Sequence, residues 1–367
     1  MQECRPEVRL SSRCRHVLEP RNHSPGCRKT AVRTDPAPRP MPAVVPCLTS
    51  YIALRYLPAM TPDPPGTPAP SPSPLSTLAL GIGGFLVGVG LLLLGGGRSN
   101  RSAAFVTSSG FAVWASIIGV QTAFWVTAAG PLWHDLIRVW RRSTADRGAL
   151  AVLAGALVVI LVVFPFFSAA ATIPWPLWGH RAKVRVLTLT AGLAVGVPAL
   201  SGIALIQQTV QRRLLDEVDE RDVRAALEAR TDLQRFLSVA GGIIGLAVLA
   251  AGALRQAVVP TFVAADVFSQ EGILLYGAFF TGLLTLVYVP AHLTLKRLGV
   301  AIREHYFPLA RMPHPTADGF TSWVDRRTTL ENLLQLHVSP AQQLQASLLI
   351  LAPLLSAVIT AVLPTLP

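Results

Sequence analysis

The sequence predicts an all-α fold, a polytopic bundle of about seven transmembrane helices with a charged cytoplasmic helical arm between the fourth and fifth spans. Apolar residues make up 51% of the 367-residue chain and charged residues only 14%. Uncharged runs of about 20 residues recur, the length that a helix needs to cross the hydrocarbon core. These runs are continuously apolar rather than alternating, which argues against transmembrane strands.

Seven runs without Asp, Glu, Lys or Arg mark the expected spans: 77–97, 104–126, 149–172, 186–206, 237–254, 273–294 and 344–364. They predict spans one to four within 77–206, spans five and six within 237–294, and span seven within 344–367. The second block, 103–133, is longer than one crossing needs. It is therefore either one tilted span or a span followed by an interfacial helix.

Residues 1–76 are predicted to form a leader outside the fold. Residues 1–59 are basic and hold all four cysteines, whose spacing fits no zinc site. This region is either a cytoplasmic tail or targeting extension, or it is not translated because synthesis starts at Met60 or Met41. The abrupt change of composition at Met60 favours the second reading. Residues 60–74 contain seven prolines in fifteen positions, which predicts disorder.

The charged segment 207–236 is predicted to be the helical arm. Acidic and basic residues four positions apart are typical of an exposed helix with ion-pair rungs. The expected rungs are Arg213–Glu217, Glu217–Arg221 and Glu220–Arg224. We expect this arm to contact a partner, either a second copy of the chain or another protein.

Residues 295–343 are predicted to form a second cytoplasmic segment. Phe320–Leu336 has the apolar spacing of an amphipathic helix that rests on the membrane or on the arm. Ser339 followed by Pro340 and Gln342 is a start signal for the last helix, with a cap, a proline at the first helical position and a glutamine three residues after the cap.

The distribution of basic residues predicts the orientation. The connections after spans two, four and six hold 16 Lys and Arg residues, and those after spans one, three and five hold 6. The positive-inside rule therefore places the N-terminus, the arm and the 295–343 segment in the cytoplasm of a plasma-membrane protein. The net charge of +12 does not indicate nucleic acid as a partner, because the charges lie in short connections between apolar runs. The expected surroundings are a lipid bilayer.

Three pairs of glycines four residues apart predict closely packed helix faces: Gly84 and Gly88, Gly192 and Gly196, and Gly241 and Gly245. These three helices are expected to form the inner packing of the bundle. Pro198 predicts a kink in span four, because proline cannot donate the backbone hydrogen bond that the helix requires.

No motif for catalysis is found: HExxH, CxxC, GxSxG and Walker sequences are missing from the sequence, and no predicted span holds an Asp or Glu. We therefore predict no enzyme, no catalytic residue, no cofactor and no metal site. The leading hypothesis is a non-enzymatic membrane scaffold or interaction protein. The alternative is a transporter or channel for a small neutral solute through spans four to six, with Arg255, Tyr276, Tyr288 and His292 as candidate pathway or span-end residues. A membrane-embedded enzyme ranks third.

Overall fold

The computed structural model describes residues 73–143, 175–216, 218–259, 261–264, 267–336 and 340–362, together with isolated positions between 148 and 158. All regular secondary structure in these ranges is helical. Nearly all of the predicted leader, 1–76, and most of the predicted third span, 149–172, lie outside the described residues. The all-α fold class is confirmed.

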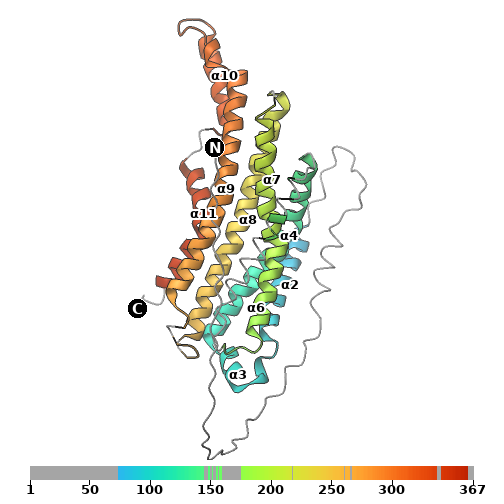
Figure 1. The fold of residues 1–367 in the computed structure, drawn as a ribbon, viewed down its shortest axis with the longest axis vertical. Helices are drawn as coiled ribbons and strands as arrows, with labels where there is room; N and C mark the ends of the chain where they lie inside the picture. Colours follow the sequence, from blue (N-terminus) through green and yellow to red (C-terminus); the bar gives the residue numbers. More distant parts are fainter. Residues whose placement is uncertain are drawn as a thin grey trace, which may run out of the picture. The chain divides into compact units, whose positions relative to one another are not determined.

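Figure 1 shows the described helices, which are α2 (Pro74–Leu93), α3 (Asn100–Val106), α4 (Ser109–Arg142), α6 (His180–Ala191), α7 (Val197–Arg213), α8 (Glu220–Val258), α9 (Gln270–Tyr306), α10 (Phe320–Leu333) and α11 (Pro340–Val362). Five stretches among them are long and apolar enough to cross a membrane: Pro74–Arg98, Ser109–Arg142, His180–Arg213, Arg221–Val258 and Gln270–Arg311. The described residues thus do not confirm all seven predicted spans. In α11 the apolar part found among the described side chains, Ser347–Thr360, is shorter than the others.

The second apolar block differs from both predicted alternatives. It contains the short helix α3, a break at Thr107 and Ser108, and then α4, which continues without interruption to Arg142. The Ser108 side chain caps α4 by accepting the backbone N–H of Phe111 at 3.2 Å. At 34 residues α4 is about 51 Å long, so it exceeds the hydrocarbon core.

Two of the three glycine pairs pack as predicted. A Cβ added to Gly84 would lie 2.9 Å from the Cα atom of Ala123 in α4, and one added to Gly241 would lie 2.6 Å from the carbonyl oxygen of Leu349 in α11. Such distances mean that the backbones touch. However, α2 is not part of the inner packing, because Leu78 and Leu86 on its other face are 60% and 63% exposed.

The third glycine pair brackets a π turn. Residues Gly192–Gly196 form this turn, which joins α6 to α7 immediately before Pro198. Proline has no N–H to offer to the preceding turn, and a wider turn accommodates that missing bond. The kink predicted at Pro198 thus takes the form of a π turn within one long helical stretch.

The main hydrophobic core lies between α4, α7, α8 and α9. Its most deeply buried members include Leu132 of α4, Ile203 of α7, Phe236 of α8 and Leu298 of α9. The Phe236 ring lies directly against Gly202 of α7, where a Cβ would be 2.4 Å from the ring. A glycine at 202 therefore makes room for the Phe236 ring, which is 1% exposed.

The charged segment 207–236 is not confirmed as a separate arm. Its first residues complete α7, a turn follows at Leu214 and Leu215, and its last residues begin α8 at Glu220. Leu233 and Phe236 within it are each 1% exposed, so this part of α8 is packed in the bundle. Because the turn interrupts the helix, Arg213 pairs with Asp222 across the turn, at 2.6 Å. Glu217, its predicted partner, lies outside the described residues.

The element that extends beyond the apolar part of the bundle is the end of α9 together with α10. At 37 residues α9 is about 55 Å long. Its last turns carry four charged residues, Lys296, Arg297, Arg303 and Glu304. The amphipathic segment predicted at 320–336 is largely helical, as α10, but none of the residues of α10 is buried. Figure 1 shows α10 beside the end of α9.

Basic and aromatic side chains close the opposite end of the bundle, where α2 ends, α6 begins and α8 connects to α9. Lys183 Nζ donates hydrogen bonds to the carbonyl oxygens of Leu92, at 2.9 Å, and Leu94, so it caps the C-terminus of α2. The guanidinium of Arg98 lies 3.9 Å from the ring centre of Trp178. Tryptophan and arginine in this setting are typical of a membrane interface.

Candidate functional site

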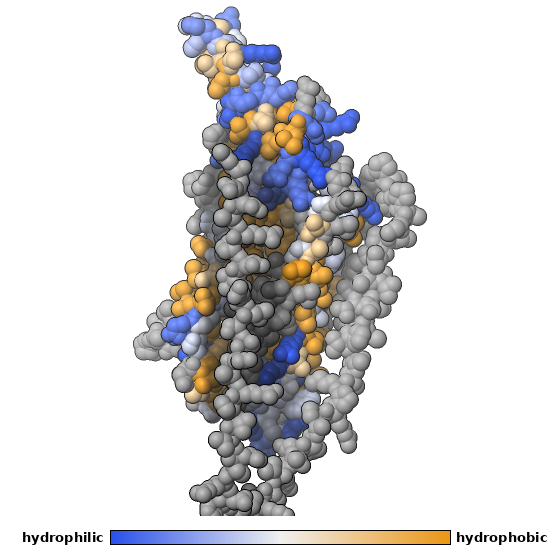
Figure 2. All heavy atoms as spheres, viewed as in Figure 1, coloured by the Kyte–Doolittle hydropathy of each residue, from blue (hydrophilic) through white to orange (hydrophobic). Residues whose placement is uncertain are grey.

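The charged end of the bundle is the candidate functional site, and we define it as residues 133–143, 207–235 and 292–336. The last turns of α4, α7 and α9, the first turns of α8, and all of α10 meet there. Figure 2 shows hydrophilic residues gathered over this end of the face drawn, and hydrophobic residues along the flank below. Ion pairs between helices hold the helix ends in place there.

A first group of ion pairs, here called the α4–α8 clasp, consists of Asp135, Arg138, Asp232 and Arg235. Arg138 Nη2 lies 2.6 Å from Asp232 Oδ1 and 2.8 Å from Asp135 Oδ1. Arg235 Nη1 lies 2.7 Å from Asp135 Oδ2. Each helix thus supplies an aspartate and an arginine, and each arginine reaches the aspartate of the other helix.

The two carboxylates of the α4–α8 clasp are buried, with side chains of Asp135 and Asp232 only 4% and 7% exposed. The arginine side chains are 38% and 53% exposed, so their outer edges remain hydrated. A buried carboxylate is costly unless it is paired, and here each aspartate has a cation within hydrogen-bonding distance. The clasp therefore fixes α4 against α8 just beyond their apolar parts.

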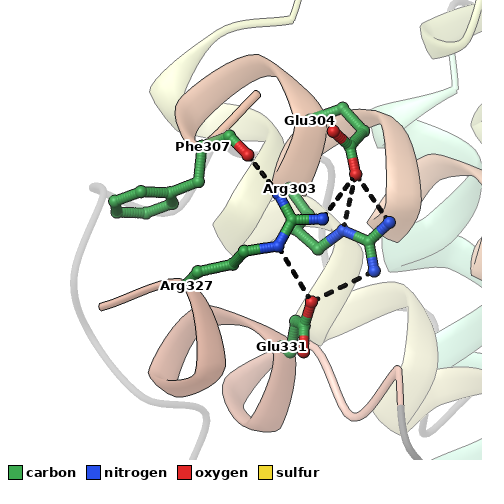
Figure 3. A network of polar contacts seen from close by, with 5 residues as sticks. All are labelled: Arg303, Glu304, Phe307, Arg327 and Glu331. Atoms are coloured by element: carbon green, nitrogen blue, oxygen red, sulfur yellow. Dashed lines mark hydrogen bonds and ion pairs between the residues drawn. The ribbon is translucent and has the colours of Figure 1, made fainter. Parts of the chain in front are cut away.

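A second group, the α9–α10 clasp, consists of Arg303, Glu304, Arg327 and Glu331 (Figure 3). Glu304 Oε1 accepts hydrogen bonds from Arg303 Nη2 at 2.6 Å and from Arg327 Nη2 at 2.7 Å. Glu331 Oε1 lies 3.1 Å from Arg303 Nη1 and 3.4 Å from Arg327 Nε. Arg327 also donates to the carbonyl oxygen of Phe307, at the end of α9. Two charges of each sign therefore hold α10 on α9.

The C-terminus of α10 is held by α8. Arg230 Nη1 donates to the carbonyl oxygens of Leu334, at 2.8 Å, and Gln335, at 3.1 Å. A cation is favourable there because the last carbonyls of a helix lack partners and carry partial negative charge. Arg230 also borders a cavity of about 20 Å³ with His292, which is room for a single water molecule rather than for a solute.

The four residues singled out from the sequence do not converge. Arg255 Nε donates to the carbonyl oxygen of Phe268 at 2.8 Å, at the opposite end of the bundle. Tyr276 packs in a small apolar cluster between α8, α9 and α11. Tyr288 and His292 stack on each other with ring centres 5.6 Å apart, about 18 Å and about 24 Å further along α9 than Tyr276. The described contacts thus give these residues no common pathway.

The residues of the α4–α8 clasp were missed as a site, although the sequence contains a signal for them. The tetrad Asp-Leu-x-Arg occurs twice, at 135–138 and at 232–235. In both tetrads the leucine is buried in the core, Leu136 at 4% and Leu233 at 1% exposure. In each helix the aspartate therefore lies one residue before a buried leucine, and the arginine lies two residues after it. Two equal tetrads on antiparallel helices can pair reciprocally, as they do here.

Replacing Arg327 by alanine is expected to release α10 from α9 while leaving the spans intact. Arg327 is 11% exposed and contacts Glu304, Glu331 and Phe307, so its loss leaves two carboxylates with one cation. Hydrogen bonds to charged groups contribute about 1.5–3 kcal/mol each. Amides of 320–333 should therefore exchange with deuterium at least about tenfold faster.

The matched control is Arg326→Ala, because Arg326 is the preceding residue in the same helix and is exposed. This variant should leave exchange in α10 within about threefold of the wild type, the effect of an ordinary surface substitution. Equal acceleration in both variants would mean that the α9–α10 clasp does not hold the helix.

Among the described residues no cluster of His, Cys, Asp and Glu could hold a metal ion. Comparisons with protein families, curated proteins and solved structures found no match. The site therefore has to be interpreted from its own geometry. In that geometry, charged helix ends are joined by ion pairs beyond the apolar parts of five helices.

Proposed function

We propose that this chain is a multi-pass plasma-membrane protein that acts, without enzymatic activity, as a scaffold or interaction protein. The observation that carries the proposal is the α9–α10 clasp. It fixes a charged helix beyond the apolar part of the bundle, and apart from the clasp residues Arg327 and Glu331, whose side chains are 11% and 13% exposed, most of this helix is exposed. An ordered helix with a largely exposed outer face is suited to receive a partner.

The placement of basic residues supports a cytoplasmic location for the charged end. The described charged end includes Arg138, Arg142, Arg212, Arg213, Arg221, Arg224, Arg230, Arg235, Lys296, Arg297, Arg303, Arg326 and Arg327. The opposite end has Arg98, Arg101, Arg181, Lys183, Arg185 and Arg255. The positive-inside rule then puts the charged end, and with it the N-terminal side of α2, in the cytoplasm.

Seven crossings are part of the proposal. A Cβ at Gly148 would lie 3.6 Å from Gln208 Oε1 at the charged end, whereas the Trp175 ring lies 5.6 Å from Phe268 at the opposite end. Gly148 and Trp175 thus lie at opposite ends of the bundle, which supports a crossing by 149–172. Helix α11 lies along the apolar half of α8, with Leu349 beside Gly241 and Thr360 beside Gly252, which supports a seventh.

The partner surface that we propose combines the outer face of α10 with the exposed residues of 207–236. Leu215, at the turn between α7 and α8, is 87% exposed, and the side chain of Arg221, at the start of α8, is 91% exposed. An exposed leucine among charged residues is the pattern of an apolar anchor with a polar rim. The partner would be a second copy of the chain or another protein.

Site-specific photo-cross-linking in intact cells tests this function. A photoreactive residue is introduced at Thr329 in α10 or at Arg221 at the start of α8, both of which are exposed. We expect a discrete protein adduct from both positions. The control position is Leu86, which is 63% exposed on the apolar face of α2 and should give adducts with lipid only.

Mass spectrometry of the adducts decides between the outcomes. An adduct of twice the chain mass identifies a second copy, and a cytoplasmic protein captured from both positions identifies another partner. Adducts only with proteins outside the cytoplasm would contradict the proposed orientation. No adduct from either position, or the same adducts from Leu86, would contradict the scaffold function.

A further inference from the structure

A cavity of about 430 Å³ lies at the charged end between the last turn of α4, the last turns of α7 and the start of α8. This volume is within the range of small-molecule sites. Four arginines line it: Arg142, Arg212, Arg213 and Arg221. Ser143 and Thr209 also line it, and their hydroxyl groups donate to the carbonyl oxygens of Trp140 and Leu205, each at 2.8 Å.

Two of these guanidinium groups are held in place by ion pairs. Arg142 Nη1 lies 2.7 Å from Glu228 Oε2, and Arg213 Nη1 lies 2.6 Å from Asp222 Oδ1. A guanidinium carries five N–H donors, so a contact through Nη1 leaves donors on the other nitrogens for a second acceptor. Because the side chains are already positioned, a ligand would not have to order them on binding.

Three aspartates line the cavity together with the four arginines, so the lining carries a formal net charge of +1. Asp222 accepts the backbone N–H of Asp219 at 2.9 Å in addition to its contact with Arg213. Asp219 lies 3.8 Å from Arg221. The remaining acidic lining residue, Asp216, is exposed in the turn. The N-terminus of α8 adds its own partial positive charge.

The cavity is close to the expected membrane surface. Gln208, one of its lining residues, follows Ile206 by two positions, and Ile206 is the last residue of the predicted fourth span, 186–206. Basic pockets between transmembrane helices at the cytoplasmic side suit the phosphate groups of lipids. The cavity is also open to solvent, where a soluble phosphate compound can reach it.

We propose that this cavity binds a phosphate group, supplied either by an anionic lipid headgroup or by a small soluble phosphate compound. Arginine binds phosphate through two parallel N–H···O contacts, and four arginines around one cavity can surround such a group. Bound phosphate would connect the end of α4 to the turn between α7 and α8. The cavity shares Arg221 with the partner surface proposed above, but the two proposals are measured separately, this one by binding of phosphate probes and the other by photo-cross-linking at Thr329 in α10.

The experiment compares two double variants of the full chain. The cavity variant is Arg212→Gln with Arg221→Gln, and the control variant is Arg311→Gln with Arg326→Gln, which removes the same charge from exposed positions at and before α10. Pyrophosphate binding is measured by calorimetry in detergent at low ionic strength. Retention of phosphatidylglycerol, from bilayer discs that also contain phosphatidylcholine, is measured by native mass spectrometry.

Weaker pyrophosphate binding in the cavity variant, by about tenfold or more, with unchanged binding in the control variant, would support a soluble phosphate ligand. Loss of phosphatidylglycerol from the cavity variant alone would support a lipid headgroup. Equal losses in both variants would show only a general effect of net charge and would overturn the proposal. Absence of both probes from the wild-type protein would overturn it as well.

Because Arg212 makes contacts of its own, the single variant Arg221→Gln gives an independent check. The side chain of Arg221 is 91% exposed, so its replacement leaves the packing of the fold unchanged. It should weaken binding of whichever probe the wild type binds, by a few-fold. The proposed phosphate site would be contradicted if Arg221→Gln bound the probe as the wild type does and the double variant lost binding only because it unfolds.

Discussion

Replacing Asp135 by alanine is expected to destabilise the bundle by about 2–3 kcal/mol. Removing one partner of a fully buried ion pair costs about 3–5 kcal/mol, because the charge left behind is neither paired nor hydrated. Here Arg138 and Arg235 would lose the carboxylate they share, but their side chains are 38% and 53% exposed and regain part of their hydration. The measurement is the apparent melting temperature of the purified protein in detergent, which should fall by several degrees.

The matched control is Glu228→Ala, which removes an ion pair between the same two helices. Arg142 and Glu228 lie 2.7 Å apart, but their side chains are 44% and 36% exposed, and such pairs contribute about 0–1 kcal/mol. A double-mutant cycle of Asp135→Ala and Arg235→Ala should give a coupling free energy of about 0.5–3 kcal/mol. A loss from Asp135→Ala no larger than that from Glu228→Ala would show that the α4–α8 clasp does not stabilise the fold.

The helices themselves could be predicted from the sequence because long uncharged runs are sufficient evidence for them. The start of α11 at Pro340 followed from a local cap signal, and the close contacts of Gly84 and Gly241 followed from local spacing. In each case the residues on which the prediction depends lie within one or two helix turns of each other. No knowledge of the neighbouring helix was needed.

The charged segment 207–236 could not be interpreted correctly from the sequence, for two physical reasons. The connection at 214–219 contains neither glycine nor proline, and its capping pair, Asp219 and Asp222, lies among other acidic residues and so does not stand out as a break in the predicted helix. The burial of Asp232 depends on Arg138, which is 94 residues away in the chain. A charge pattern alone is typical of a helix face in contact with solvent. The face of α8 that carries Asp232 is buried only because α4 packs against it in the antiparallel direction.

The repeated Asp-Leu-x-Arg tetrad shows what a sequence reading could have used. Either tetrad alone, at 135–138 or 232–235, is an ordinary pair of opposite charges three residues apart on a helix. Together they are informative, because two equal tetrads on antiparallel neighbours bring each arginine to the aspartate of the other. The prediction requires the pairing of helices first, and apolar runs do not specify that pairing.

Replacing Gly84 by valine is expected to separate α2 from α4. A Cβ at this position would lie 2.9 Å from the Cα atom of Ala123 and 3.1 Å from the carbonyl oxygen of Thr122. These are backbone atoms, which cannot rotate away, so α2 as a whole has to move. In a bilayer no hydrophobic effect returns the helix, since lipid replaces the lost contact, and overpacking of this kind costs about 1–3 kcal/mol.

Disulfide formation between α2 and α4 measures this separation directly. A Cβ at Gly81 would lie 3.7 Å from Thr127 Cγ2, so cysteines at 81 and 127 should form a disulfide under mild oxidation. Serine at Cys4, Cys14, Cys27 and Cys47 leaves no other thiol in the chain. In this background Gly84→Val should reduce the fraction of cross-linked protein several-fold.

Gly83→Val is the matched control because it changes the same residue type in the adjacent position of the same helix. A Cβ at Gly83 meets no atom within 4 Å, so the valine would point into open space on the lipid side. Both variants alter the helix propensity of α2 equally, and only one inserts atoms between α2 and α4. Equal cross-linking in the two variants would mean that α2 can move away from α4 without cost. A loss confined to Gly84→Val would establish the glycine face as the contact that holds α2 on α4.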